Sequence, residues 1–180
     1  KPLHKPEDLK GMKIRTSGGH GQFIRVKFLE GVPNFTAWPD VPLALSQGNF
    51  DGLITTNESL VSAKLWEAGV KYALQDFQGF AQYIPLVADA FLEKLTPEQR
   101  KILFDTWAEM IDGFRQQAAA AQDKARETMA EHGIKVLDAA KADLDATRKR
   151  MLATQDDVIK ELKMDPALVA KIDATLGAMN

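Results

Sequence analysis

The sequence predicts an α/β fold, in which a parallel sheet alternates with helices and is followed by one long helix and a helical C-terminal tail. Two observations predict it. In the first third of the 180 residues, short apolar runs recur about every twenty residues with helical periodicity between them, as in parallel sheets with crossover helices. From Ala90 onward, the spacing of apolar residues is almost entirely helical.

The expected strands are short runs of apolar and β-branched residues, each followed by a signal for a turn or a helix start. Glycines follow the first strand, Asp40 precedes a helix beginning at Val41, and Asn57 precedes a helix that Gly69 ends. The strands are expected at residues 12–16, 32–37 and 52–55, with further extended runs at 70–74, 83–87 and 134–137. No periodicity separates the runs 70–74 and 83–87, so we interpret that stretch as a crossover and not as a hairpin.

A long helix is predicted by a strong start signal. Thr96 caps it, Pro97 occupies the first helical position and Gln99 completes a capping box, and the helical pattern continues to Gly133. At about 1.5 Å per residue, this helix measures roughly 50 Å, which exceeds the width of a small lobe. We therefore expect it to lie along two lobes and to tie them together. Two or three further helices follow, the last starting at Pro166.

Composition excludes several classes of protein and site. The net charge is −2, from 23 basic and 25 acidic residues, so no electrostatic excess favours nucleic acid or an anionic membrane surface. No apolar run approaches the roughly 20 residues needed to cross a bilayer, so the chain is not expected to be membrane-spanning. Cysteine is absent, which excludes disulfides and thiolate sites. The chain begins at Lys1 without a signal peptide, and we expect it to be processed or truncated.

Catalytic and metal sites find little support. His4, His20 and His132 have no partners at a metal-ligand spacing, so neither a metal nor a cofactor is expected. Ser17 and His20 lie near each other in sequence, but no strained nucleophile motif and no third member accompanies them. The glycine-rich junction from Ser17 to Gly21 matches neither the P-loop nor the dinucleotide pattern. It is either a tight turn that needs glycine torsions or an anion contact at a helix start.

Arg15 is the strongest single candidate for ligand binding. It ends a predicted parallel strand, and ligands of open α/β sheets bind beyond the carboxyl ends of the strands. A guanidinium group is permanently charged and forms two parallel hydrogen bonds to a carboxylate. Lys13, two residues earlier, points to the same face of the strand. The alternative interpretation is a surface arginine in an ordinary salt bridge.

Trp38 and Thr55 are further candidates, because both follow predicted strands at the same edge of the sheet. The Trp38 ring is able to stack on a ligand, although core packing is the commoner role of a lone tryptophan. Thr55 offers a hydroxyl group, although Thr55, Thr56 and Asn57 together also form a helix-capping cluster.

Four segments of the chain, in order, are similar to the motifs of one family. They are KPEDLKGMKIR at 5–15, LALSQGNFDG at 43–52, KLWEAGVKY at 64–72 and LEKLTPEQ at 92–99. They resemble "P-x-DLKGLKIR", "ALQ-x-G-x-VDG", "K-x-YEV-x-KY" and "W-x-x-L-x-x-E-x-Q" of the TRAP-transporter substrate-binding proteins, the DctP family. The resemblance runs with hardly a gap from Lys5 to about Val136 and fades toward the C-terminus.

The resemblance implies a type II periplasmic-binding-protein-like fold, in which two lobes close on a hinge around a ligand. Residues 1–75 would belong to the second lobe and 76–95 would cross back toward the first. Residues 96–133 would form a helix spanning both lobes, and 134–180 would form the C-terminal strand and helices. Most of the N-terminal lobe would precede Lys1.

The resemblance also implies a function. Family members are periplasmic, non-enzymatic proteins that capture a small organic carboxylate and deliver it to the membrane subunits of a TRAP transporter. The family's carboxylate-binding arginine falls at Arg15, and its aromatic residue falls at Trp38 with a shift of one position. Thr55 stands where many members have an asparagine. Threonine is shorter and lacks the amide, which favours a less polar, aromatic or branched acid.

Two other classes stay open from the residues alone. An α/β enzyme acting on a small anionic substrate would need a general base near Arg15, and His20 is the one that the sequence offers. A helical adaptor or dimerisation module would use the long helix as a coiled coil. Against the second reading, the apolar pattern of that helix is no sustained heptad and dissolves into alanine after Phe114.

Overall fold

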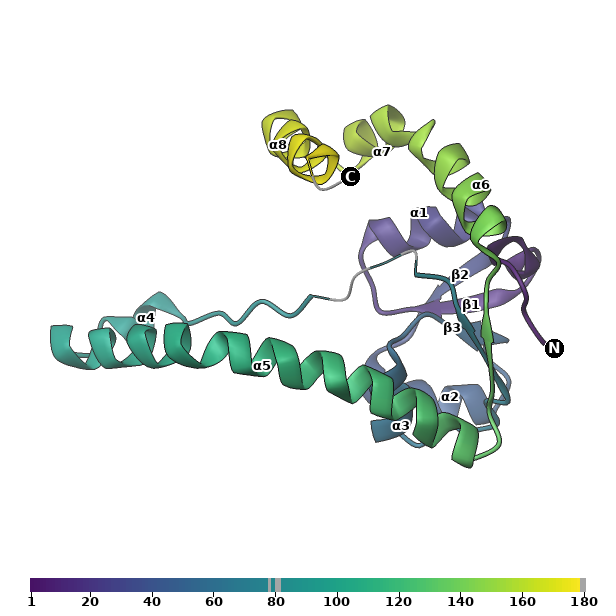
Figure 1. Cartoon of the computed structure of the whole chain (residues 1–180), viewed down its shortest axis with the longest axis horizontal. Coiled ribbons are helices and arrows are strands. Elements are labelled where there is room, and N and C mark those ends of the chain that lie inside the picture. Colours follow the sequence, from purple (N-terminus) through teal and green to yellow (C-terminus); the bar gives the residue numbers. More distant parts are fainter. Residues whose placement is uncertain (78, 80–81, 179–180) are drawn as a thin grey trace.

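A three-stranded parallel sheet organises the N-terminal part of the chain in the computed structural model, which describes residues 1–77, 79 and 82–178 (Figure 1). β1 (Lys13–Thr16) lies in the centre, between β2 (Val32–Phe35) and β3 (Gly52–Leu53), and both neighbours run parallel to it. The three strands predicted for this region are confirmed, although β2 and β3 end earlier than the sequence predicts.

Short helices connect these strands, because parallel strands cannot be joined by a tight turn. They are η1 (Pro6–Leu9) before β1, α1 (His20–Phe28) between β1 and β2, η2 (Trp38–Asp40) and α2 (Val41–Ser46) between β2 and β3, and α3 (Asn57–Ser62) after β3. The sheet and its helices therefore form the α/β arrangement that the sequence predicts.

One of these helices differs from the prediction at both ends. The helix expected to continue to Gly69 stops at the end of α3, because Lys64 takes a left-handed φ of 48° and turns the chain. Its N-cap is Thr56, whose hydroxyl accepts a hydrogen bond from the Ser59 N–H at 3.2 Å. Asn57 is thus the first helical residue and not the cap, which frees its side chain for another contact.

A second, two-stranded sheet joins segments that lie far apart in the sequence. β4 (Tyr72–Gln75) pairs in parallel with β5 (Lys135–Asp138). Between them the chain passes through α4 (Asp89–Leu92) and the long helix α5 (Pro97–Glu131). The run at 83–87 was expected to be extended, but it forms no strand in the described structure.

The long helix begins as predicted. The Thr96 hydroxyl accepts a hydrogen bond from the Gln99 N–H at 3.3 Å, and the Gln99 side chain accepts one from the Thr96 N–H at 2.9 Å. This reciprocal capping box fixes the first turn. The helix has 35 residues and is therefore about 50 Å long. Its buried residues, Ala125 and Met129, lie near its C-terminal end, where it packs against α3.

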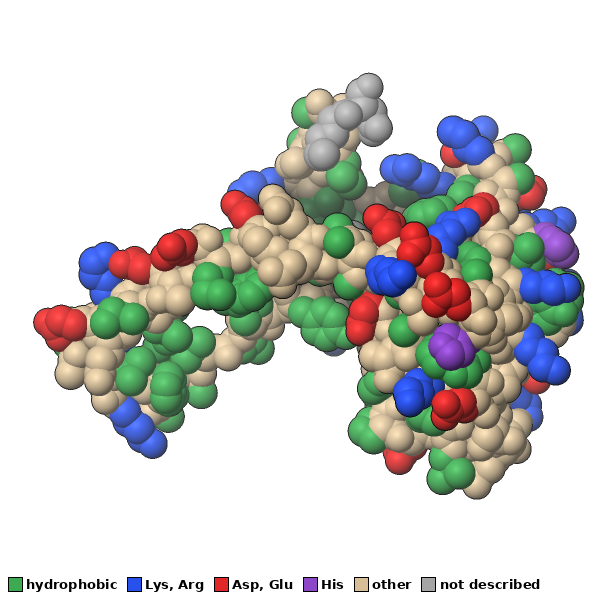
Figure 2. Space-filling model, turned by 60° about the horizontal axis from the view of Figure 1, so that its bottom comes forward, with side chains coloured by type: hydrophobic (Ala, Val, Ile, Leu, Met, Phe, Trp, Pro, Cys, Tyr) green, Lys and Arg blue, Asp and Glu red, His purple; other side chains and the backbone are tan. Residues whose placement is uncertain are grey.

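The N-terminal half of α5 projects away from the sheets (Figure 1) and carries apolar side chains on its surface (Figure 2). Each of these side chains is at least 40% exposed: Ile102, Phe104, Trp107, Met110 and Phe114. Trp107, Met110 and Phe114 stand three and four residues apart, so they form one apolar face of α5, and Ile102 and Phe104 flank this face on opposite sides.

The hydrophobic core lies where α2, α3 and the C-terminal end of α5 meet. It consists of Val41, Ala44, Phe50, Leu60, Leu65, Met129 and Ile134. Residues 41–65 supply most of this cluster, and Met129 and Ile134 supply the rest. The cluster therefore anchors the C-terminal end of α5 to the helices that follow β2 and β3.

Three helices make up the C-terminal tail: α6 (Lys141–Leu152), α7 (Gln155–Glu161) and α8 (Pro166–Gly177). The last begins at Pro166, as predicted. Among the described helices, none combines the length and the apolar character that crossing a membrane requires.

A polar link ties this tail to the start of the chain. The Thr147 hydroxyl, fully buried in α6, donates to the Glu7 carboxylate of η1 at 2.6 Å, and Arg150 donates to the same oxygen at 3.0 Å. Burial alone would raise the pKa of the Glu7 carboxyl, but the hydrogen bond from Thr147 and the charge of Arg150 hold that pKa below its ordinary value. The link therefore depends on the ionised form of Glu7.

Thr147→Val should lower the free energy of unfolding by about 1 to 2 kcal/mol at pH 7, because it leaves a half-buried carboxylate without its shortest hydrogen bond. A group whose pKa is lowered on folding stabilises the protein above its unfolded pKa, near about 4.3, and loses this effect as the pH falls through the folded value. The difference between denaturant melts of the two proteins should therefore shrink as the pH falls from 7 to 3. Thr175→Val, which removes an exposed hydroxyl bonded within α8, is the matched control. A difference that persists unchanged at pH 3 would contradict the assignment.

Candidate functional site

Arg15 lies near the carboxyl end of the central strand β1 and is almost completely buried, with 3% of its surface exposed. Its Nε donates a hydrogen bond to the Thr36 carbonyl oxygen at 2.9 Å. The central carbon of its guanidinium group lies 5.2 Å from the centre of the Trp38 ring, which is the distance of a cation–π contact. The side chain is therefore held in one orientation by the segment that follows β2.

The charge of Arg15 has no acidic partner in the described part of the chain. The salt bridges of these residues all involve other cations. Burial lowers the pKa of the Arg15 guanidinium from its ordinary value, yet an arginine stays protonated at physiological pH. A buried cation without a counter-ion is energetically unfavourable unless an anion joins it. Arg15 is thus not a surface arginine in an ordinary salt bridge, which was the alternative interpretation.

Trp38 is brought next to Arg15 by its place at the start of η2, directly before α2. It is half-buried, and one part of its ring packs against the hydrophobic core. The core-packing role of a lone tryptophan therefore applies in part, and the same ring also covers the guanidinium group, while its stacking on a ligand stays a prediction.

Thr55 lies at the same edge of the sheet, and no hydrogen bond or ring contact among the described residues joins it to Arg15 or Trp38. The N–H of Ile54 donates to the Arg15 carbonyl oxygen at 3.0 Å, so Thr55 follows directly after the pairing of β3 with β1. Thr55 lines a cavity of about 270 Å³, whose walls include neither Arg15 nor Trp38. The structure thus brings Arg15 and Trp38 together and places Thr55 in the neighbouring cavity.

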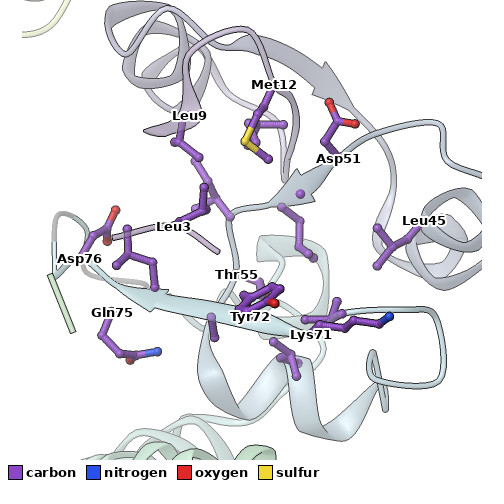
Figure 3. Close-up of a pocket in the computed structure, with 18 of the residues that line it drawn as sticks. Leu3, Leu9, Met12, Leu45, Asp51, Thr55, Lys71, Tyr72, Gln75 and Asp76 are labelled. Carbon is purple, nitrogen blue, oxygen red and sulfur yellow. The ribbon is translucent and has the colours of Figure 1, made fainter. Parts of the chain in front are cut away.

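That cavity lies between β3 and β4 (Figure 3). Most of its lining comes from three segments, namely the chain before β1, the residues around β3, and β4 with its flanks, and residues of β1, α1, α2 and α3 complete it. Its polar lining includes Arg25 and Asp76, which form an ion pair, and the Nε of Arg25 is buried without a hydrogen-bond partner in the described structure. Sequence reasoning missed this pair, because its two members are far apart in the chain.

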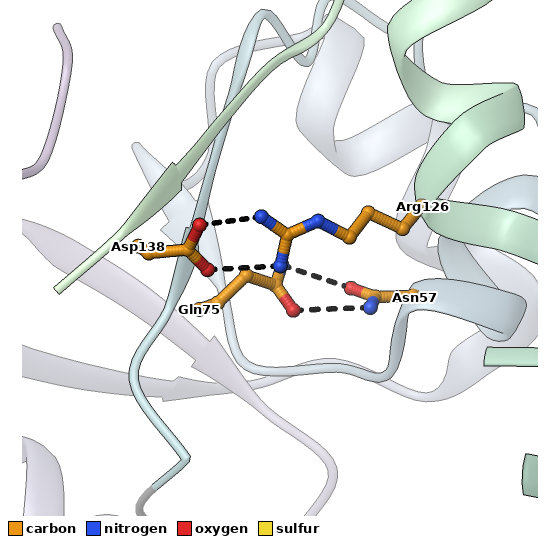
Figure 4. Close-up of polar contacts among 4 residues, drawn as sticks. All are labelled: Asn57, Gln75, Arg126 and Asp138. Carbon is orange, nitrogen blue, oxygen red and sulfur yellow. Dashed lines mark hydrogen bonds and ion pairs between the residues drawn. The ribbon is translucent and has the colours of Figure 1, made fainter. Parts of the chain in front are cut away.

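Two polar contacts hold the second sheet against the helices (Figure 4). The side-chain amides of Asn57 in α3 and Gln75 in β4 exchange two hydrogen bonds of 3.0 Å. Arg126 of α5 donates to both carboxylate oxygens of Asp138 in β5, at 2.8 and 2.5 Å. These contacts, which sequence reasoning also missed, fix both β4 and β5 to the helices beside them.

The glycine junction after β1 is a tight turn. Gly18 and Gly19 take φ values of 101° and 79°, which side chains with a Cβ rarely adopt. The N–H of Ser17 donates to the Gln22 side chain at 2.9 Å. Among the described residues, no hydrogen bond joins the Ser17 hydroxyl to His20, and no cluster of His, Asp and Glu could hold a metal ion.

A comparison with protein families identifies the family of the chain that carries this site. Residues 1–161 match the model of bacterial extracellular solute-binding proteins, family 7, also called DctP. The chain belongs to this family. The resemblance of the four sequence segments to this family is thereby confirmed.

Individual relatives agree with this membership. The uncharacterized protein YiiZ of Salmonella typhimurium is 32% identical over 102 residues, which are 57% of this chain and 31% of YiiZ. A TRAP periplasmic solute-binding protein from Ralstonia eutropha, solved with bound (S)-2-acetolactate, is 27% identical with a TM-score of 0.81 and matches 99% of this chain. One from Actinobacillus succinogenes, solved with bound L-galactonate, is 29% identical with a TM-score of 0.69 and matches 82% of this chain.

This chain is shorter than those relatives. It covers 57% of the Ralstonia eutropha protein and 48% of the Actinobacillus succinogenes protein. The fold predicted from the sequence, an α/β lobe of the periplasmic binding protein type with a long helix, is confirmed by these matches.

Arg15→Met should leave the free energy of unfolding of the ligand-free protein within about 1 kcal/mol of the wild type. Methionine loses the contacts to Trp38 and Thr36, but it also removes a buried charge that has no counter-ion. The matched control is Arg25→Met, which removes the cation paired with Asp76 and should cost about 2 kcal/mol. Denaturant unfolding measures both. Equal destabilisation by the two variants would show that Arg15 is as well compensated as Arg25.

Proposed function

We propose that this chain supplies the carboxylate-binding lobe of an extracytoplasmic solute-binding protein, which captures a small organic acid for a TRAP-type transporter. The observation that carries the proposal is the buried, unpaired cation of Arg15 at the carboxyl end of a parallel strand. Family membership supports it, and the two relatives above were solved with acids that carry a carboxylate.

The contact to the acid follows from the orientation of Arg15. Its Nε is engaged by the Thr36 carbonyl oxygen, so the two terminal nitrogens are the pair that it presents to a carboxylate. Two parallel hydrogen bonds then neutralise the buried charge. Trp38 keeps water from one side of the guanidinium group and covers the apolar part of the acid. Exclusion of water strengthens the ion pair, because the effective dielectric constant falls.

Thr55 contributes a hydroxyl group from the neighbouring cavity between β3 and β4. A hydroxyl offers one donor and accepts as well, so it suits an oxygen of the ligand that lies away from the carboxylate. Its shorter reach, compared with an asparagine, leaves room for a branched acid.

The lobe boundaries inferred from the sequence form part of the proposal. Residues 1–75 form the second lobe, 76–95 cross toward the first lobe, 96–133 span both, and 134–180 complete the C-terminal strand and helices. The apolar face on the projecting half of α5 supports this arrangement, since soluble proteins rarely leave such a continuous face uncovered. The first lobe covers that face, and closure of the two lobes encloses the acid.

The proposed role is binding without catalysis, in the periplasm, with the membrane subunits of the transporter as the partner. The alternative of an α/β enzyme predicts turnover of an acid that binds at Arg15. Incubation of the full-length protein with a bound acid, followed by mass spectrometry, distinguishes the two, because a binding protein returns the acid unchanged.

Arg15→Gln in the full-length protein should weaken binding of the acid by about 2 to 5 kcal/mol, since a desolvated carboxylate loses its charged partner. Native mass spectrometry of protein purified without refolding identifies the co-purified acid, and calorimetry with that acid measures the affinity. Lys13→Gln is the matched control: it removes a cation from the same face of β1, but from an exposed position. Unchanged affinity in the Arg15 variant would exclude the proposed role.

A further inference from the structure

Asn34 is the direct neighbour of Arg15 in the sheet. In the parallel pairing of β1 with β2, Arg15 stands opposite Asn34. Neighbouring residues of paired strands point to the same face of the sheet, and the strands lie about 4.8 Å apart. The amide of Asn34 therefore rises from the same face as the guanidinium group, and it is half-buried there.

Thr36 holds both side chains. Its carbonyl oxygen accepts the hydrogen bond from Arg15 Nε at 2.9 Å, and its hydroxyl donates to Asn34 Oδ1 at 2.9 Å. The second contact uses the oxygen of the amide as acceptor, which fixes the amide plane and leaves the Nδ2 group as the other end. Two sets of donors, the terminal nitrogens of Arg15 and Nδ2 of Asn34, are thus anchored on one residue.

The Nδ2 group of Asn34 has N–H donors without an acceptor in the described part of the chain. A primary amide carries two N–H bonds, and the contacts of the described residues include no acceptor for either one from Asn34. A half-buried donor without an acceptor is unfavourable in a dry site, for the same reason as the unpaired charge beside it. Both are satisfied at once by a ligand with two oxygen groups on adjacent carbons.

We propose that Asn34 is a specificity-determining residue, whose amide donates to an oxygen substituent on the carbon next to the carboxylate that Arg15 binds. Thr36 is the positioning residue that orients this amide. The site thereby selects 2-hydroxy and 2-oxo acids over acids that lack the oxygen. This inference rests on the proposed function, since it takes the carboxylate at Arg15 as given.

Matched pairs of acids test it in the full-length protein by calorimetry. In each pair a methyl group replaces the 2-hydroxyl: lactate with isobutyrate, malate with methylsuccinate, and 2-hydroxyisobutyrate with pivalate. In at least one pair the wild type should bind the hydroxy acid about 10-fold or more tighter, the typical effect of one hydrogen bond in a desolvated site. Asn34→Leu should abolish this ratio and leave the affinity for the methyl analogue within about twofold.

Further variants separate selection from a structural role. Thr36→Val should reduce the ratio because the amide is no longer oriented, and Thr36→Ser, which keeps the hydroxyl, should restore it. Asn49→Leu, at an exposed position, is the control and should change neither affinity. A merely structural Asn34 would lower both affinities of a pair equally. Asn34→Ala replaces the leucine variant if circular dichroism shows that the latter does not fold.

The outcomes distinguish this inference from the proposed function. If the wild type binds no acid, or if Arg15→Gln retains binding, the proposed function is wrong and the role of Asn34 is wrong with it. If the wild type binds acids but favours no hydroxy member, or if the ratio survives in Asn34→Leu, the selective role of Asn34 is wrong while the proposed function stands.

Discussion

The cost of burying one arginine without a counter-ion organises the rest of this molecule. The guanidinium group of Arg15 is removed from water at the end of the central strand, and the described chain offers it a carbonyl oxygen and an indole ring in place of an anion. In the proposed function an acid supplies the missing counter-ion, so the unpaired charge of Arg15 becomes a source of affinity. The surrounding elements fix the position of this charged group. The sheet fixes the backbone of Arg15, and the segment after β2 fixes its side chain.

Much of the fold is predictable from the sequence, for reasons that particular residues illustrate. The strand β1 and the turn after it follow from an apolar run and from glycines that take positive φ. The start of α5 follows from its capping box, since Thr96, Pro97 and Gln99 are a local signal that needs no tertiary contact. The end of α3 was not predictable, because Lys64, a residue with no preference for left-handed torsions, turns the chain there.

The candidate site, like the fold, was only partly predictable from the sequence. Arg15 and Trp38 stand at strand ends that periodicity locates, and the structure places them in contact, while their role toward a ligand stays a prediction. The holding role of Thr36 was not predictable, because it depends on the direction of a backbone carbonyl after β2. Nor were the pairs Arg25 with Asp76 and Asn57 with Gln75, whose members meet only through the tertiary fold.

The pairing of β4 with β5 has a consequence for the order of folding. The two strands are neighbours in space, yet the whole of α4 and α5 separates them along the chain. Closing so long a loop costs chain entropy, which slows the formation of the pair. A helix that forms early is a stiff rod, and the capping box at Thr96 favours early formation of α5. Docking of the C-terminal end of α5 on α3 would bring β5 next to β4, so we expect the two-stranded sheet to form last.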